Sequence, residues 1–282
     1  GVHWTPVEAA LALLRDRLSP VTGSEMQPIT GGLGRVLAED VQAVRSNPPL
    51  PNTAVDGYGF AGPLASGPHL MPLVQGRSAA GASFEGAVPA GQAVRVLTGA
   101  ALPLGVDTVI LQEDVRADAT HIAFYGPLKQ GANARKAGED VQAGAVILHK
   151  GRVLTPADLA LCSAVGVAEV PVHKPLRIGV ISTGDELVEP GNPAAPDQIY
   201  DANRPMLLAL VEQFGFVPVD LGRVTDDRDA LRQRLDQAAT KVDLILTSGG
   251  ASAGDEDHVS ALLTEAGAMQ EWRIAIKPGR PL

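Results

Sequence analysis

The chain has 282 residues, of which 45% are hydrophobic and 20% charged, a composition typical of a globular protein with a buried core. Its net charge of −9, without a cluster of Lys and Arg along a predicted helix, argues against a nucleic acid or an anionic membrane as the main partner. The apolar runs are far shorter than the roughly 20 residues that span a bilayer. A single cysteine, Cys162, excludes an internal disulfide framework, and we expect a cytoplasmic protein.

The first part of the chain predicts two kinds of structure. Apolar periodicity predicts an amphipathic helix over 6–18 and a second helix over 156–165. Between them, residues 47–140 predict a mainly β domain, because short apolar runs alternate with Gly and Pro turns. Its clearest strands are expected at 93–99, 107–114 and 121–126. We expect this β domain to be inserted into an outer mixed α+β domain formed by residues 1–46 and 141–170.

The last part, residues 171–282, alternates strands with helices. Short β-branched runs predict strands at 176–182, 216–221, 242–247 and 271–277. Helical patterns lie between them; the first carries Leu207, Leu210 and Val211, and the last covers about 257–266. This alternation is typical of βαβ units with a parallel sheet. The chain as a whole therefore predicts a multidomain α/β protein that ends in a parallel-sheet domain.

Polar and acidic loops follow three of these strands, with the sequences STGDEL, RVTDD and TSGGASAGDED. In an open parallel sheet, ligands bind outside the carboxyl ends of the strands. The third loop lacks bulk at Ser248, Gly249, Gly250, Ser252 and Gly254, so that its backbone N–H groups can approach an anion closely. Asp255, Glu256 and Asp257 follow, and carboxylates beside a phosphate require a hard cation such as Mg²⁺. The alternative is that these acids cap helices and solvate loops.

Known loop motifs narrow the chemistry further. The third loop is neither a Walker A loop nor GxGxxG, which argues against ATPase and dinucleotide-binding functions. Its GASAG segment does match the GxSxG nucleophile elbow. Too few residues follow Ser252, however, to supply Asp and His from separate later loops, so a serine hydrolase is not favoured. Near the end of the chain, Arg273, Lys277 and Arg280 predict either an oxyanion site or a strand edge guarded by basic residues.

Seven motifs in this order resemble the molybdopterin molybdenumtransferase family, which includes the enzymatic domain of gephyrin. They are PNTAVDGYGF, RVLTGAALPLGVDTVILQED, NARKAGEDVQAG, GVISTGDELVEPG, IYDANRPML, TSGGASAGDEDHV and WRIAIKPGRPL. The resemblance implies an enzyme that inserts molybdate into adenylylated molybdopterin with Mg²⁺ and releases AMP. It also implies a cytosolic homodimer, with the site between the molybdopterin-binding sheet domain of one subunit and the β domain of the other. Molybdopterin adenylyltransferase and molybdoenzymes are the protein partners that it suggests.

The resemblance assigns residues one by one. Asp56, Thr98 and Asp140 match functional positions in and beside the β domain. Glu186, Asp226 and Asp257 match acidic positions of the sheet domain, expected to organise Mg²⁺ and the pyrophosphate, with Asp227 as a neighbouring alternative to Asp226. Lys277 matches a family lysine, whereas Arg273 and Arg280 stand where the family often has lysine. Lys277 and Arg273 are expected to neutralise charge on phosphate or molybdate, and the Ser248–Gly254 loop to hold phosphate.

The family pattern continues beyond KPGRPL, so the chain is expected to be a fragment with an unpaired sheet edge and lower stability than a longer chain. Two related enzymes, molybdopterin adenylyltransferase and a nucleotide-cleaving pyrophosphatase, have a similar last third but lack the region 1–170. A non-catalytic scaffold with the same fold is the alternative from another class. Retention of the acidic positions favours catalysis, since a scaffold gains nothing from their mutual repulsion.

Overall fold

The computed structural model describes residues 4–249 and 258–266. The chain divides into two compact units, one formed by residues 26–171 and the other by residues 1–25 and 172–282. The sequence-based prediction placed the whole of 1–46 in the outer domain, whereas this division groups residues 1–25 with the last part of the chain. None of the described helices is both long and apolar enough to cross a membrane.

The unit of residues 26–171 contains a six-stranded sheet in the order β7-β4-β6-β5-β9-β8. Its strands are β4 (Gly57–Phe60), β5 (Leu64–Ser78), β6 (Ala93–Val96), β7 (Thr108–Leu111), β8 (Val115–Ala117) and β9 (His121–Leu128). All neighbouring strands are antiparallel except β5 and β6, which run parallel. Two apolar clusters fill the interior, one around Phe60 and Ile122 and the other around Val94 and Val109. The mainly β character predicted for the middle of the chain is thus observed.

The sheet differs from the prediction at β5 and β7. The 15-residue strand β5 was not predicted, because Gly67, Pro68, Pro72 and Gly76 interrupt its apolar pattern. The strand accommodates them with register shifts against both neighbours. The strand expected at 107–114 stops at Leu111, and a 3-10 turn, η2 (Gln112–Asp114), follows. In this sheet, short apolar runs predicted where strands lie but not how long they are.

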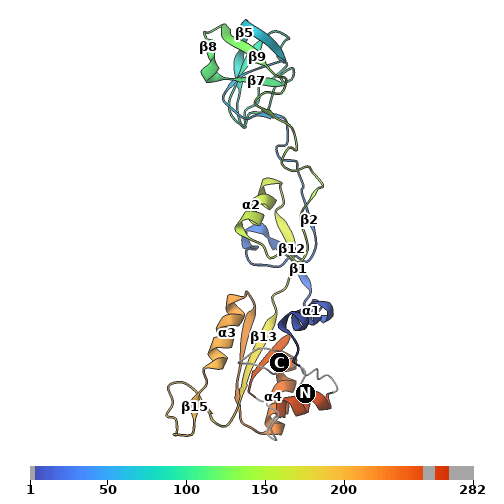
Figure 1. Ribbon diagram of the computed structural model, residues 1–282, viewed down its shortest axis with the longest axis vertical. Coiled ribbons are helices and arrows are strands. Elements are labelled where there is room, and N and C mark those ends of the chain that lie inside the picture. The colour runs from blue at the N-terminus through green and yellow to red at the C-terminus, as the bar shows by residue number, and fades with distance from the viewer. Residues whose placement is uncertain (1–3, 250–257, 267–282) are drawn as a thin grey trace. The chain divides into compact units, whose positions relative to one another are not determined.

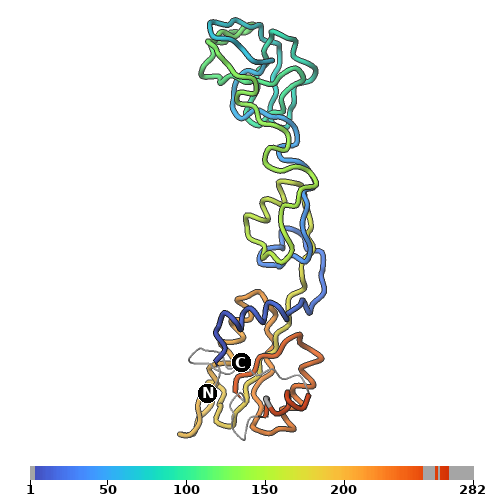
Figure 2. The backbone as a smooth tube through the Cα atoms, turned by 45° about the vertical axis from the view of Figure 1, so that its right-hand side comes forward, coloured from blue at the N-terminus to red at the C-terminus, as the bar shows by residue number. Residues whose placement is uncertain are grey.

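Segments on either side of the β-rich part pair with each other. β1 (Ser24–Pro28) pairs with β12 (Glu169–His173), and β2 (Val41–Gln42) pairs with β11 (Val146–Leu148). Asn47 N donates to Val141 O at 2.8 Å and Val141 N donates to Asn47 O at 3.1 Å, so the chain entering the β-rich part runs beside the chain leaving it (Figure 2). These contacts support the proposal that 47–140 is inserted between flanks that form one outer domain.

The helix of the outer segment, α2 (Pro156–Ala164), begins with a capping box. The Thr155 hydroxyl accepts from Asp158 N, and the Asp158 carboxylate accepts from Thr155 N at 2.9 Å. Asp158 Oδ2 also accepts from Arg152 Nε at 2.9 Å, although the Asp158 side chain is only 4% exposed. These bonds to the charged form, with that of Arg152 the strongest, lower the pKa of Asp158 to about 2.

The second unit contains a three-stranded parallel sheet, which confirms the predicted architecture. β13 (Arg177–Thr183) lies between β16 (Val217–Val224) and β17 (Leu244–Ser248). Side chains alternate along β13: Ile178 and Val180 pack against α3 (Asn203–Gln213), whereas Ile181 packs against α4 (Arg228–Ala239) and α5 (His258–Glu265). Helices therefore cover both faces of the sheet (Figure 1). The strand predicted at 271–277 lies outside the described residues.

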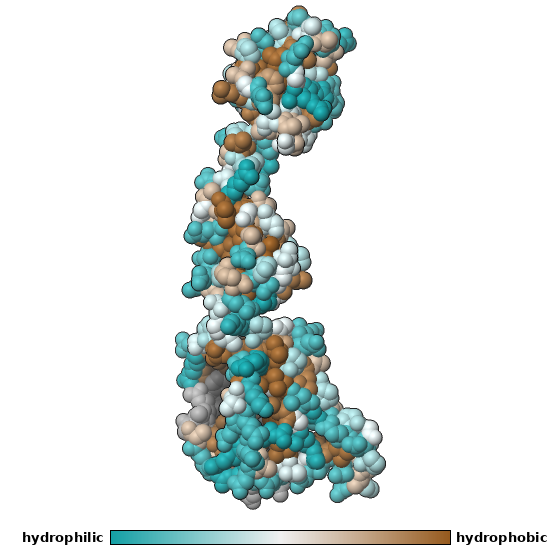
Figure 3. Space-filling model, turned by 180° about the vertical axis from the view of Figure 1, so that it is seen from behind, coloured by the Kyte–Doolittle hydropathy of each residue, from teal (hydrophilic) through white to brown (hydrophobic). Residues whose placement is uncertain are grey.

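Smaller elements complete this unit, and some apolar side chains remain at its surface. The helix α1 (Val7–Arg17) precedes the sheet, and β14 (Leu187–Val188) and β15 (Ile199–Tyr200) form a short parallel pair between β13 and α3. The surface is mainly hydrophilic with apolar patches (Figure 3). Large exposed apolar residues of the unit include Leu18, Val21, Ile199, Tyr200 and Phe214.

Candidate functional site

The first two strand exits of the parallel sheet are joined by a pair of backbone-to-carboxylate bonds. Asp185 N donates to Asp226 Oδ2 at 3.1 Å, and Asp226 N donates to Asp185 Oδ1 at 3.2 Å. The loop after β13 and the loop after β16 thus hold each other, as expected for the carboxyl edge of a parallel sheet. Glu186 follows directly in the first loop, so two of the three predicted acidic positions lie on adjacent strand exits.

The structure separates the roles of the two neighbouring aspartates, Asp226 and Asp227. Asp227 is the N-cap of α4, because its Oδ1 accepts from Ala230 N at 2.7 Å. Asp226 instead faces the loop after β13 through Asp185. A structural task thus occupies Asp227, and this favours Asp226 as the site position.

The third strand exit also lies against the first. An added Cβ at Gly249 would lie 2.4 Å from Thr183 O, and Gly249 has a φ of +96°, so only glycine fits between the two exits. Ser248 Oγ accepts from Asn203 Nδ2 at 3.0 Å, which fixes the end of β17 to the first residue of α3. Thr183 Oγ1 is buried and has no hydrogen-bond partner among the described residues. All three predicted loops therefore begin at one edge of the sheet.

A buried arginine ties the loop after β13 to the rest of the unit. Arg204 is 7% exposed and binds three carboxylates, those of Asp201, Asp220 and Glu189. Glu189 belongs to the loop that carries Glu186, whereas Asp220 belongs to β16. The Arg204 cluster thus fixes this loop relative to the sheet. The IYDANRPML motif contains Asn203 and Arg204, but the sequence did not identify their roles. Apart from Asp201, their partners Ser248, Asp220 and Glu189 lie far from them along the chain.

The other unit holds the predicted pair Asp56 and Thr98 in direct contact. Asp56 Oδ1 accepts from Thr98 N at 2.6 Å and from Thr98 Oγ1 at 2.7 Å. The bond from the Thr98 backbone, followed by that from its hydroxyl, lowers the pKa of Asp56 below its ordinary value. Asp56 is therefore an ionised carboxylate at neutral pH, with one oxygen held in place. Oδ2 has no donor among the described residues and stays available to a ligand.

Backbone pairing brings the three motifs of this unit together. The short strands β3 (Asn52–Thr53) and β10 (Ala134–Arg135) pair antiparallel, and Thr53 also exchanges backbone bonds with Gly99 and Ala100. Asp140 follows β10 and accepts from Arg135 Nη2 at 2.5 Å. Asp56 and Thr98 are thus in direct contact, whereas Asp140 is linked to β10 through Arg135.

Part of the predicted site lies outside the described residues, namely Gly250, Ser252, Gly254, Asp257, Arg273 and Lys277. Within 4–249 and 258–266, no group of three or more metal-ligating side chains is present. The described carboxylates at the sheet edge are oxygen donors of the kind that Mg²⁺ prefers. Their chemistry is compatible with this cation.

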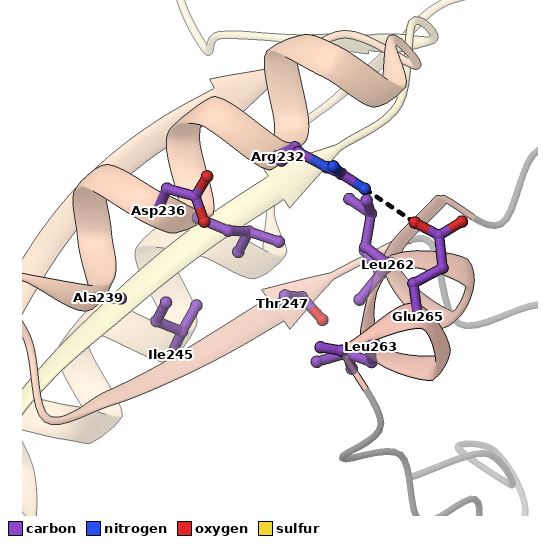
Figure 4. A pocket seen from close by; sticks show the side chains of 11 residues that line it. Arg232, Asp236, Ala239, Ile245, Thr247, Leu262, Leu263 and Glu265 are labelled. Atoms are coloured by element: carbon purple, nitrogen blue, oxygen red, sulfur yellow. Dashed lines mark hydrogen bonds and ion pairs between the residues drawn. The ribbon is translucent and has the colours of Figure 1, made fainter.

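A hollow of about 600 Å³ lies elsewhere in the sheet unit, between α4, β17 and α5 (Figure 4). Its walls include Leu235, Ile245 and Leu262, and at its rim Arg232 Nη2 binds Glu265 Oε2 at 2.8 Å. Among the residues that the structure describes, none of the predicted site positions lines this hollow. We therefore place the candidate site at the strand exits, where the polar groups converge, and not here.

Comparisons with known proteins define the class of protein first. Residues 5–166 match the family model "MoeA N-terminal region (domain I and II)", and residues 179–282 match "Probable molybdopterin binding domain". A solved structure, the molybdopterin biosynthesis MoeA protein of Pyrococcus horikoshii, has a TM-score of 0.81 and 33% identity, and the match covers 99% of this chain and 71% of that one. The fold is thus that of a MoeA-type protein, with the predicted mixed, β-rich and parallel-sheet parts.

Curated relatives then identify the family. The molybdopterin molybdenumtransferase of Haemophilus influenzae is 38% identical over 277 residues, which is 98% of this chain and 68% of the relative. Molybdopterin molybdenumtransferase 2 of Mycobacterium tuberculosis is 36% identical, over 90% of this chain and 65% of the relative. The chain spans about two thirds of the length of these relatives. It belongs to the molybdopterin molybdenumtransferase family, whose members are transferases of molybdenum cofactor biosynthesis.

Proposed function

We propose that the protein inserts molybdate into adenylylated molybdopterin, in a reaction that needs Mg²⁺ and releases AMP. The observation that carries this proposal is the convergence of three strand exits at one sheet edge. There the Asp185–Asp226 pair joins two exits, and Gly249 packs against Thr183. Such an edge combines an approach for phosphate with carboxylates for a cation.

The residues of this edge divide into three roles. The Ser248–Gly254 loop would bind phosphate oxygens through its backbone N–H groups. Glu186, Asp226 and Asp257 would hold Mg²⁺, which when bound neutralises charge on the pyrophosphate. Lys277 and Arg273 would balance the negative charge of the phosphate or of molybdate, the substrate. The Arg204 cluster would keep the loop of Glu186 in place, because Glu189 in that loop binds Arg204.

The second set of residues would act across a homodimer. Asp56, Thr98 and Asp140 lie in the unit of residues 26–171, and we propose that they reach the sheet edge of the other subunit. Two observations support a ligand at this position: Asp56 is ionised and its Oδ2 is available. Exposed large apolar residues of the same unit, such as Leu50 and Leu104, are of the kind that a subunit interface covers. Molybdopterin adenylyltransferase and molybdoenzymes would be its protein partners, in the cytoplasm.

The test is AMP release from adenylylated molybdopterin, with Mg²⁺ present and molybdate supplied or omitted. The relative from Haemophilus influenzae serves as the positive control. We expect release that depends on molybdate and that EDTA abolishes. The Asp226→Asn variant should lose this release while it keeps the melting temperature of the wild type, because Asn retains the shape of the side chain.

Other outcomes would identify a different function. Release of AMP at the same rate without molybdate would indicate a nucleotide-cleaving pyrophosphatase. Binding of adenylylated molybdopterin without release, under conditions in which the relative is active, would indicate a non-catalytic binding module. Full activity of Asp226→Asn would show that the carboxylates of the sheet edge have been assigned the wrong role.

A further inference from the structure

Arg95 occupies an unusual position beside Asp56. It is half-buried on β6, its guanidinium lies 5.0 Å from the centroid of the Tyr58 ring, and no carboxylate of the described residues forms an ion pair with it. Its nitrogens bind neutral groups instead: Nη1 donates to Tyr58 Oη at 2.9 Å, and Nη2 donates to Gln112 Oε1 at 2.5 Å. The charge of Arg95 also acts through space on Asp56, whose pKa it helps to lower without a direct contact between the two groups. A half-buried cation is unfavourable unless it is paired or hydrogen-bonded, and Arg95 is held in place by its two neutral acceptors.

The two acceptors of Arg95 connect to Asp56 from both sides. Tyr58 is two residues after Asp56 on the chain and is 7% exposed. On the other side, Gln112 N donates to Asp56 O at 3.1 Å. Arg95 itself lies three residues before Thr98, which binds the Asp56 carboxylate. The contacts thus form a closed ring from Asp56 through Gln112, Arg95 and Tyr58 back to Asp56.

Gly57, between Asp56 and Tyr58, cannot carry a side chain. An added Cβ at Gly57 would lie 1.9 Å from Ile110 O of β7, so position 57 accommodates only glycine without a shift of the backbone. The closed ring of contacts through Arg95, together with the close approach at Gly57, holds the backbone of Asp56. Thr98 then fixes Oδ1 of its carboxylate, which leaves Oδ2 in one defined place.

We propose that Arg95 is a positioning residue for Asp56, acting through Tyr58 and Gln112. Arg95 does not touch the substrate; it holds the Asp56 backbone so that the free carboxylate oxygen meets its ligand. The planar guanidinium is required because it bonds two acceptors at once, which a lysine ammonium does not do in the same geometry. This inference rests on the proposed function for the role of Asp56, but the contacts themselves do not depend on it.

The test compares Arg95→Lys and Tyr58→Phe with the wild type. Arg95→Lys keeps the positive charge but loses the planar guanidinium with its two donors. Tyr58→Phe keeps the aromatic ring but loses the hydroxyl that accepts from Arg95 Nη1. Arg77→Lys is the matched control, because Arg77 is exposed and lies opposite Arg95 in the register of β5 and β6. We expect about a tenfold fall in kcat for both test variants, with KM within about twofold, because misplaced groups lower the rate rather than the affinity. The control should retain both constants.

A second measurement separates positioning from simple destabilisation. NMR titration of the Asp56 carboxyl should show a higher pKa in both test variants, because the bonds from Thr98 that lower it loosen, whereas Arg77→Lys should leave it unchanged. An unchanged pKa of Asp56 in Arg95→Lys and Tyr58→Phe would overturn the inference, even if both variants melt at lower temperature. If the wild type releases no AMP, the proposed function fails, and the titration still decides whether Arg95 positions Asp56.

Discussion

Replacement of Asp158 by Asn tests the electrostatics of the capping box at the start of α2. The Asp158 carboxylate accepts three bonds at Oδ2, from Arg152 Nε, Thr155 N and Thr155 Oγ1. Asn preserves the shape but removes the negative charge that these donors bind. The α2 cap should therefore weaken while the fold remains.

The magnitude follows from the pKa of Asp158, which lies at about 2 against an ordinary value of 3.8. At roughly 1.4 kcal/mol per pH unit, this difference corresponds to about 2.5 kcal/mol of stabilisation by the charged form. Arg152 is half exposed, so solvent screens part of its contribution and we expect about 2 kcal/mol. In a unit of this size, such a loss lowers the melting temperature by about 4–8 °C.

The pH dependence gives the sign. Because the pKa of Asp158 is lower in the folded state, its stabilisation is fully present above about pH 4 and is lost as the pH falls towards 2. Urea unfolding should show a gap of about 2 kcal/mol between the wild type and Asp158→Asn at pH 7, reduced to about half at pH 3. Hydrogen exchange of the α2 amides localises the effect.

The control for this experiment is Asp114→Asn, which replaces an exposed aspartate of the same unit. It should change the free energy of unfolding by less than about 0.5 kcal/mol. If the gap for Asp158→Asn were equal at pH 3 and pH 7, ionisation of Asp158 would not be its cause, and the reasoning would be refuted.

Two further predictions concern the sheet edge. Asp227→Ala should lower the free energy of unfolding by about 1 kcal/mol, because it removes the α4 cap, but should retain molybdate-dependent AMP release. Asp226→Asn should lose AMP release and keep the free energy of unfolding. Identical behaviour of the two variants in urea unfolding and in the AMP assay would contradict the separation of their roles. Gly249→Ala should abolish AMP release and destabilise the protein by at least about 1 kcal/mol, because its Cβ would collide with Thr183 O at a φ of +96°; a fully active Gly249→Ala protein would show that the strand exits need not approach so closely.

The central strand of the parallel sheet, β13, could be predicted because it is a short, buried and β-branched run. Ile178, Val180 and Ile181 face helices on both sides, so an uninterrupted apolar run is the expected signature. β5 could not be predicted in the same way. It is amphipathic, interrupted by Gly and Pro, and stabilised by its two neighbours rather than by its own pattern.

The candidate site shows the same division. The acidic loops after β13 and β16 were predicted to meet, since parallel strands end at one edge, and the Asp185–Asp226 bonds join them. The partners of Arg95, and Glu189 and Asp220 as partners of Arg204, could not be predicted, because only the folded chain brings them near. A sequence shows which residues carry charge, but not which neighbours hold them in position.

The antiparallel bridge between Asn47 and Val141 has a consequence for engineering. Asn47 and Val141 exchange two backbone hydrogen bonds, so the segment between them starts and ends at almost the same point. Excision of 48–140 would leave two ends that a short turn can join, and the paired flanks β2 and β11 would keep their partner. A segment attached in this way can be removed or replaced with little change to the flanks that carry it. A graft of residues 48–140 would carry the Asp56 carboxylate together with Arg95, Tyr58 and Gln112, whose contacts position it.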